Sequence, residues 1–151
     1  MTEYLQRAIE IAAKSAVSGG GPFGAVLVTA DGQIFEGTNA VTLNHDPSAH
    51  AEVMALRNAG QALGTHDLTG ATLYSSCEPC PMCLSASMWA RVDRLVYAAS
   101  AEEAAEAGFD DRAFYEHIRS ESTPFEYHHL ASDARLHPFQ AWQQNTERID
   151  Y

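Results

Sequence analysis

Residues 71–100 alternate between strand and helix patterns, and this alternation is the feature that most restricts the fold. ATLYSS (71–76) is a short apolar run typical of a buried strand, residues 80–90 have a helical pattern, and residues 92–100 return to a strand pattern. Two strands joined through a helix pair in parallel, because the crossover returns the chain in the same direction. The sequence therefore predicts an α/β sandwich with parallel strand pairing.

The remaining patterns predict a single domain, residues 1–151. No linker, internal repeat or low-complexity tract interrupts the chain, and 151 residues are enough to bury a full core. An Asp31-Gly32 turn is expected to join two strands, FGAVLVTA and a second ending near Asn39. FEYHHL (125–130) is expected to be a last strand. Further helices are expected at 2–18, 49–63, 101–107, 112–119 and near 138–148.

Charge and hydrophobicity argue against two classes of partner. The formal net charge is −11 with only nine Lys and Arg, and nucleic-acid affinity depends largely on neutralising phosphates. No run of about 18 apolar residues is present, so no membrane partner is expected. The first residues, MTEYLQRAIE, lack the apolar stretch of a signal peptide, and the cytoplasm is the expected compartment.

All three cysteines of the chain fall in SSCEPCPMC (75–83). An odd number in one cluster is a poor disulfide framework and more often indicates a metal or catalysis. Cys80 and Cys83 are three residues apart in the first turn of the expected helix, so their side chains point the same way. The exposed amides of a helix start also favour thiolates. Zinc needs at least one more ligand, which His50 can supply as an imidazole.

Three protein ligands leave a fourth position open, which is the catalytic rather than the structural arrangement of zinc. A proton carrier is then needed, and Glu52 follows His50 by two residues. Positions two apart do not share a helix face, so the pair requires His50 to lie at the very start of its helix. H-x-E followed by P-C-x-x-C is the signature of zinc nucleobase deaminases.

Two other interpretations of the cysteines are weaker. A redox pair of Cys80 and Cys83 would make His50 and Glu52 coincidental. A closed zinc site that includes Cys77 would use a residue at a strand end, before Glu78-Pro79, outside the helical alignment. Cys77 is therefore expected to be a small, partly buried residue.

Over nearly its whole length the chain resembles the cytidine deaminase superfamily, and within it the bacterial guanine deaminases. The resemblance includes GGPFGAVLV, the asparagine of EGTN, NHDPSAHAEVMALR, LYSSCEPCPMC, MWAR, YAASAEEAAEAGFDD and HPFQAW with the final tyrosine. AEAGFDD and the aromatic C-terminal end resemble the guanine branch and not the branch that acts on tRNA.

The resemblance implies a three-layer α/β/α sandwich with a mixed five-stranded sheet. It also implies one zinc ion per subunit and a homodimer that exchanges its C-terminal segment, about 130–151, between subunits. The implied reaction is hydrolytic deamination of guanine to xanthine and ammonia, so that the partner is a small purine base.

The same resemblance implies roles for individual residues. His50, Cys80 and Cys83 would hold zinc, and Glu52 would be the proton shuttle. The residues implied in substrate binding are Asn39, Asp111 with its neighbour Asp110 as the second choice, Tyr151 contributed from the other subunit, Phe23 and Trp89 as apolar walls, and Ala51.

Other functions stay open at this point. Deamination of a nucleoside such as guanosine or cytidine, or of another aminated ring, would use the same zinc motif. A zinc-stabilised interaction module without catalysis is a further alternative, against which Glu52 argues, because it is not a metal ligand. A nucleic-acid-binding module is the alternative that the acidic charge disfavours most.

Overall fold

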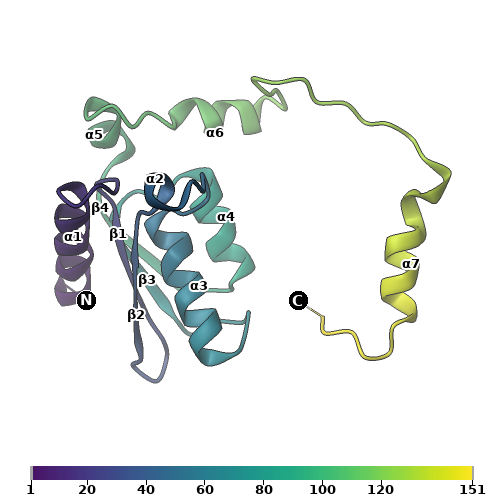
Figure 1. The fold of residues 1–151 in the computed structure, drawn as a ribbon, viewed down its shortest axis with the longest axis horizontal. Helices are drawn as coiled ribbons and strands as arrows, with labels where there is room; N and C mark the ends of the chain where they lie inside the picture. The colour runs from purple at the N-terminus through teal and green to yellow at the C-terminus, as the bar shows by residue number, and fades with distance from the viewer. Residues whose placement is uncertain (1, 151) are drawn as a thin grey trace. The chain divides into compact units, whose positions relative to one another are not determined.

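The computed structural model describes residues 2–150, and the chain forms two compact units, Met1–Tyr115 and Glu116–Tyr151 (Figure 1). The elements of the first unit are α1 (Thr2–Ala16), β1 (Gly24–Val28), β2 (Ile34–Thr38), α2 (Val41–Asn44), α3 (Ala51–Leu63), β3 (Thr72–Cys77), α4 (Pro81–Trp89), β4 (Arg94–Ala99) and α5 (Ala101–Glu106). Helix α6 (Arg112–Arg119) crosses the boundary, and the second unit contains a 3-10 helix, η1 (Asp133–Leu136), and α7 (His137–Gln144). Within residues 2–150, every helix is too short or too polar to cross a bilayer.

The sheet of the first unit is mixed and has the strand order β2-β1-β3-β4. Strand β1 runs antiparallel to β2 and to β3, whereas β3 and β4 are parallel, with Cys77 opposite Ala99. Helix α4 is the crossover between the two parallel strands. The parallel pairing predicted for residues 71–100 is therefore confirmed, and so is the hairpin turned at Asp31-Gly32, where Gly32 has φ of +87°.

The described residues contain four strands and not the five expected. FEYHHL (125–130), expected to be the last strand, has no regular secondary structure and is exposed throughout. A strand is stable only beside a hydrogen-bonded neighbour and over a buried face, and this segment has neither. The mixed α/β/α architecture itself is as predicted.

Helices cover both faces of the sheet (Figure 1). Helix α1 packs on one face, where Ala8 and Ile11 meet Val26 and Tyr74. Helices α3 and α4 pack on the other face. The buried residues of that larger core cluster are Ala25, Leu27, Ala51, Ala55, Leu56, Ala59, Leu68, Ala71 and Leu73, with Ala86 of α4 and its C-cap, Ala90, packed against them. Alternate residues of β1 thus serve opposite faces, as the two-residue period of a strand requires.

Gly37 brings the start of α3 close to the sheet. A Cβ at this position of β2 would overlap the backbone of Ala51 and the amide of Ala55. Since only glycine permits this approach, the first turn of α3 lies directly on β2. The residues that open α3, His50 to Glu52, are thereby held next to the sheet.

The second unit has no buried side chain among residues 118–150. Its large apolar side chains that stand exposed include Phe125, Tyr127, Leu130, Leu136, Phe139, Trp142 and Ile149. So many exposed aromatic and aliphatic groups in one short segment are unusual, because burial of such groups is the main stabilising term in folding.

Candidate metal centre and adjoining cavity

Three potential metal ligands from two segments lie within 4.8 Å of one another: His50, Cys80 and Cys83. The Sγ atoms of Cys80 and Cys83 lie 3.6 Å and 3.5 Å from Nδ1 of His50. A tetrahedral zinc ion with ordinary Zn–S and Zn–N bonds separates a sulfur and a nitrogen ligand by about 3.6 Å. The donor atoms and their spacing therefore fit zinc, with Nδ1 as the imidazole ligand.

Both segments present their ligands at a helix start. His50 is the N-cap of α3 and Cys80 the N-cap of α4, each with an extended backbone, φ and ψ being −69° and 154° for His50 and −65° and 167° for Cys80. The expectation that His50 precedes the regular helix is confirmed. Pro81 at the first helical position of α4 suits the ring's fixed φ, and Cys83 follows within the first turn. Because His50 and Cys80 have extended backbones, their side chains and that of Cys83 converge on one position.

One of the two sulfurs, that of Cys80, is held as a thiolate, which is the form that binds metal. A hydrogen bond from the Cys83 thiol lowers the pKa of Cys80 to about 4 and raises the pKa of Cys83. The hydrogen bond with Cys80 also raises the pKa of His50. Without metal, the Cys80 thiolate thus lies beside the His50 ring, and Cys83 keeps its proton. A cation would displace the remaining thiol proton, because zinc binds cysteine as the thiolate.

Glu52 lies beside this group without belonging to it. Its side chain is buried, Ser75 Oγ donates to its Oε1 at 3.1 Å, and its Oε2 lies 3.5 Å from the Sγ of Cys83. Burial raises the pKa of Glu52, since a charged carboxylate is costly away from water. A carboxyl group in this environment can exchange protons closer to neutral pH than an exposed one.

Cys77 stands apart from the three potential ligands. It ends β3, is buried, and its Sγ lies 3.8 Å from the carbonyl oxygen of Ser100. Burial raises the pKa of Cys77 to about 11, so its sulfur is a neutral thiol at physiological pH. Its side chain does line the adjoining cavity, which its place in the sequence did not suggest.

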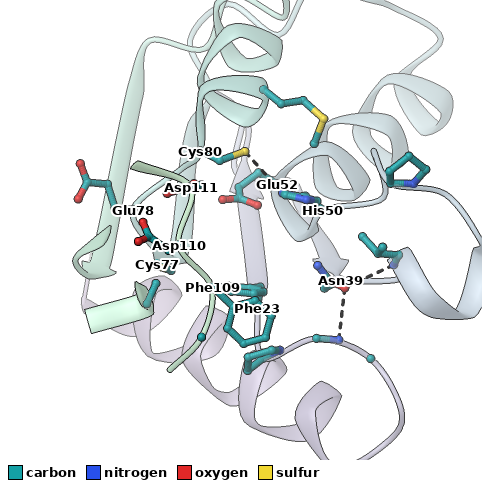
Figure 2. Close-up of a pocket in the computed structure, with 18 of the residues that line it drawn as sticks. Phe23, Asn39, His50, Glu52, Cys77, Glu78, Cys80, Phe109, Asp110 and Asp111 are labelled. Carbon is teal, nitrogen blue, oxygen red and sulfur yellow. Dashed lines mark hydrogen bonds between the residues drawn. The ribbon is translucent and has the colours of Figure 1, made fainter. Parts of the chain in front are cut away.

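A cavity of about 720 Å³ opens next to the metal centre, and Asn39 lines it (Figure 2). The amide oxygen of Asn39 accepts from the backbone N–H of Gly21 at 3.3 Å and of Val41 at 3.4 Å. Because two donors hold the oxygen, the amide nitrogen is the group left for a ligand in the cavity. A Cβ at Gly21 would lie 2.9 Å from Asn39 Cγ, so the glycine allows this approach.

Two aromatic rings form a wall of the cavity. Phe23 and Phe109 meet edge to face, with 5.0 Å between ring centroids and 87° between ring planes (Figure 2). Such a pair presents an apolar face to a planar ligand. Phe23, which the resemblance implied as an apolar wall, thus lines the cavity together with Phe109.

Asp110 and Asp111 both line the cavity but differ in their partners. Arg112 donates to both carboxylate oxygens of Asp110, at 2.8 and 2.7 Å, and lowers the pKa of Asp110 to about 2. Desolvation instead raises the pKa of Asp111, and within residues 2–150 no side chain donates to its carboxylate. Asp111 is thus the carboxylate with acceptors to offer a ligand.

Two of the predicted substrate-binding residues, Trp89 and Ala51, are not brought to this cavity. Trp89, predicted to be an apolar wall, ends α4 in a different hollow with Ser85 and Arg91 and is 66% exposed. Ala51, the first residue of α3, is fully buried in the core. Its side chain points in a different direction from those of its neighbours His50 and Glu52. Tyr151 lies outside the described residues.

Other residues at the site escaped the sequence analysis. Phe109 belongs to AEAGFDD and was not singled out. Tyr115 Oη donates to the carbonyl oxygen of Pro79 at 2.8 Å, and the Glu78 carboxylate, which lines the cavity, accepts from the N–H of Ala101 at 3.0 Å. These contacts join residues more than 20 apart, and no short motif signals them.

Comparisons with known proteins agree with this geometry. Residues 1–99 match the family described as the cytidine and deoxycytidylate deaminase zinc-binding region. Guanine deaminase of Bacillus subtilis strain 168 is 45% identical over 98% of this chain and 97% of its own length, and its crystal structure superposes with a TM-score of 0.95 over 99% of this chain and 98% of the other.

Two more distant relatives cover less of the chain. The tRNA-specific adenosine deaminase of Buchnera aphidicola subsp. Baizongia pistaciae is 45% identical, but over 64% of this chain and 59% of its own length. A protein solved in complex with 2,6-diaminopurine is 35% identical, with a TM-score of 0.67 over 72% of this chain and 61% of the other.

Proposed function

The chain belongs to the cytidine and deoxycytidylate deaminase zinc-binding family, and from this we propose that it is a zinc-dependent guanine deaminase. The reaction is hydrolysis of guanine at C2, in which water replaces the exocyclic amine and gives xanthine and ammonia. One observation carries the choice of substrate: the likeness to a guanine deaminase covers 98% of this chain, whereas the likeness to a tRNA-specific adenosine deaminase covers 64%.

His50, Cys80 and Cys83 would hold the zinc ion, which supplies Lewis-acid activation of the attacking water. Glu52 would take a proton from that water and give it to a ring nitrogen, and a second transfer would let the amine leave as ammonia. Its burial and its raised pKa support this role, because they bring its proton affinity closer to that of the groups it serves.

The cavity offers complementary groups to a purine edge and face. The amide nitrogen of Asn39 would donate to a purine acceptor, and the Asp111 carboxylate would accept from ring N–H or amino groups. Phe23 and Phe109 would contact the flat face. A neutral base also needs no basic surface, which is compatible with a net charge of −11.

A homodimer that exchanges its C-terminal segment, about 130–151, is the proposed assembly. The exposed apolar side chains of residues 118–150 support it, since a second copy of the chain would bury them. Met88 and Trp89, both exposed at the end of α4, are a second apolar surface available to a partner. Tyr151 would then close the other subunit's cavity. The cytoplasm is the proposed compartment, because the zinc ligands must be free thiols and all three cysteines are unpaired.

Ammonia release tests the proposed substrate directly. Purified, zinc-loaded protein is incubated with guanine, guanosine, adenine, cytosine and cytidine, and ammonia is measured over time. Guanine should be deaminated fastest by a wide margin. Equal or faster turnover of guanosine would favour a nucleoside deaminase, and release from cytosine or cytidine alone would reject the guanine assignment.

A further inference from the structure

The segment between β4 and Tyr115 carries Asp111 and Phe109 yet has little packing of its own. It contains α5 and the beginning of α6, and neither helix has a buried residue. A segment without buried side chains opens at low free-energy cost, so that few contacts decide its position. Besides the contact between the Phe23 and Phe109 rings, two hydrogen-bonded attachments to the loop before Cys80 fasten it. These contacts together control where the Asp111 carboxylate lies.

Its first attachment is at the start of α5. The Glu78 carboxylate accepts from the N–H of Ala101 at 3.0 Å, and the N–H of Glu78 donates to the carbonyl oxygen of Ala99 at 2.8 Å. Ser100 and Glu103 form a capping box at the same helix start. Glu78 thereby ties the beginning of the segment to the loop that leads into Cys80.

Its second attachment is at the opposite end. Tyr115 Oη donates to the carbonyl oxygen of Pro79 at 2.8 Å, and Pro79 is buried. Asp111 lies one helical turn before Tyr115, and its carbonyl oxygen accepts from the N–H of Phe114 at 2.9 Å. The first turn of α6 therefore links the position of the Tyr115 hydroxyl to that of Asp111.

Both attachments end on consecutive residues, Glu78 and Pro79, immediately before the zinc ligand Cys80. We propose that Glu78 and Tyr115 are positioning residues that clamp residues 101–115 to the zinc loop and so hold Asp111 at a set place beside the metal centre. The clamp joins the part of the site that recognises the base to the part that does the chemistry. Its effect on substrate rests on the proposed function, through the role of Asp111.

Tyr115→Phe tests the clamp with the least disturbance, because it removes one hydroxyl. The KM for guanine should rise about 3- to 10-fold, the range expected for one lost hydrogen bond, while kcat changes less and the zinc content stays the same. Tyr4→Phe is the matched control: Tyr4 lies on α1, its ring packs at a tilt of 43° against Tyr74 with 5.4 Å between centroids, and its substitution should leave KM unchanged.

A double-mutant cycle separates positioning from general loss of structure. If Tyr115 acts through Asp111, the Tyr115→Phe change should alter KM less than about 2-fold in an Asp111→Ala background. At the other attachment, Glu78→Gln retains an acceptor for the Ala101 N–H and should preserve much of the wild-type KM, whereas Glu78→Ala should not. An unchanged KM in Tyr115→Phe, or full additivity with Asp111→Ala, would overturn the clamp.

Amide hydrogen exchange gives a measurement that does not depend on activity. Residues 101–115 should exchange faster in Tyr115→Phe and in Glu78→Ala than in wild type or Tyr4→Phe, while α3 exchanges at the same rate in all four. Equal exchange across the variants would reject the clamp even in an active enzyme. Conversely, wild-type protein that releases no ammonia from guanine would reject the proposed function and leave the exchange result to decide the clamp.

Discussion

The Oε2 of Glu52 lies 3.5 Å from the Sγ of Cys83. A buried carboxyl group that does not belong to the candidate ligand group thus borders one of its sulfurs. The proposed zinc binding and the proposed proton transfer therefore belong to different side chains that are in contact. Each can be removed by mutation while the other stays in place, which makes the two roles separable by experiment.

Glu52→Gln should retain zinc and lose turnover. The substitution keeps the size of the side chain and its contact with Ser75 but removes the proton carrier, and kcat should fall by about 10²- to 10⁴-fold. Steady-state ammonia release and zinc analysis of the same preparation measure both effects. Retention of more than about a tenth of the wild-type kcat would contradict the shuttle role.

The stability of the zinc-free protein should decrease as pH rises above the ordinary carboxyl range. Burial raises the pKa of Glu52 in the folded state from 4.5, so the folded protein holds a proton that the unfolded chain has already released. That contribution is complete below pH 4.5 and is lost as pH rises through the folded pKa. Urea unfolding of wild type and Glu52→Gln across this range isolates it, because glutamine stays neutral; a constant difference between the two proteins would refute the raised pKa.

Cysteine variants should differ in zinc content according to whether the cysteine belongs to the metal centre. Cys80→Ser and Cys83→Ser should each lose stoichiometric zinc, whereas Cys77→Ser should keep it, since Cys77 lies outside the ligand group. Zinc at a 100-fold excess over its Kd should raise the unfolding temperature by roughly 5–10 °C in wild type and Cys77→Ser only. Zinc loss from Cys77→Ser would revive the closed four-ligand site.

Asn39→Ala and Asp111→Ala should weaken guanine use more than Asp110→Ala. Each of the first two removes a polar group offered to the base. The value of kcat/KM should therefore fall about 10- to 150-fold, a loss of about 1.5–3 kcal/mol in transition-state stabilisation. Asp110 already pairs with Arg112, and its substitution should cost less than about 5-fold. Steady-state kinetics with guanine measure all three, and a larger effect at Asp110 would reverse their roles.

Tyr151→Ala should impair turnover while the protein stays dimeric and zinc-loaded. The proposal that this residue closes the partner's cavity predicts a loss without unfolding. Tyr127→Ala serves as the comparison for interface burial, because the proposal places Tyr127 among the apolar side chains covered by the second copy but not at the cavity. Light scattering, zinc analysis and ammonia release are measured together; full activity of Tyr151→Ala would reject the closing role.

The sequence by itself determined the metal chemistry and the fold class. HAE and PCPMC carry donor atoms whose affinity for zinc depends on residue type, and both lie at helix starts that local patterns mark. The strand and helix periods of residues 71–100 likewise act over a few residues, which is why the parallel pairing followed from them.

Only the tertiary structure decided which side chains surround the cavity. Phe109 and not Trp89 meets Phe23, Arg112 occupies Asp110 and leaves Asp111 available, and Tyr115 reaches back to Pro79. These outcomes depend on contacts between residues distant in sequence and on the direction of each side chain around its helix. The periodicity of a sequence predicts which residues lie on the same face of a helix or strand. Which other residues contact that face depends on how the elements pack in three dimensions.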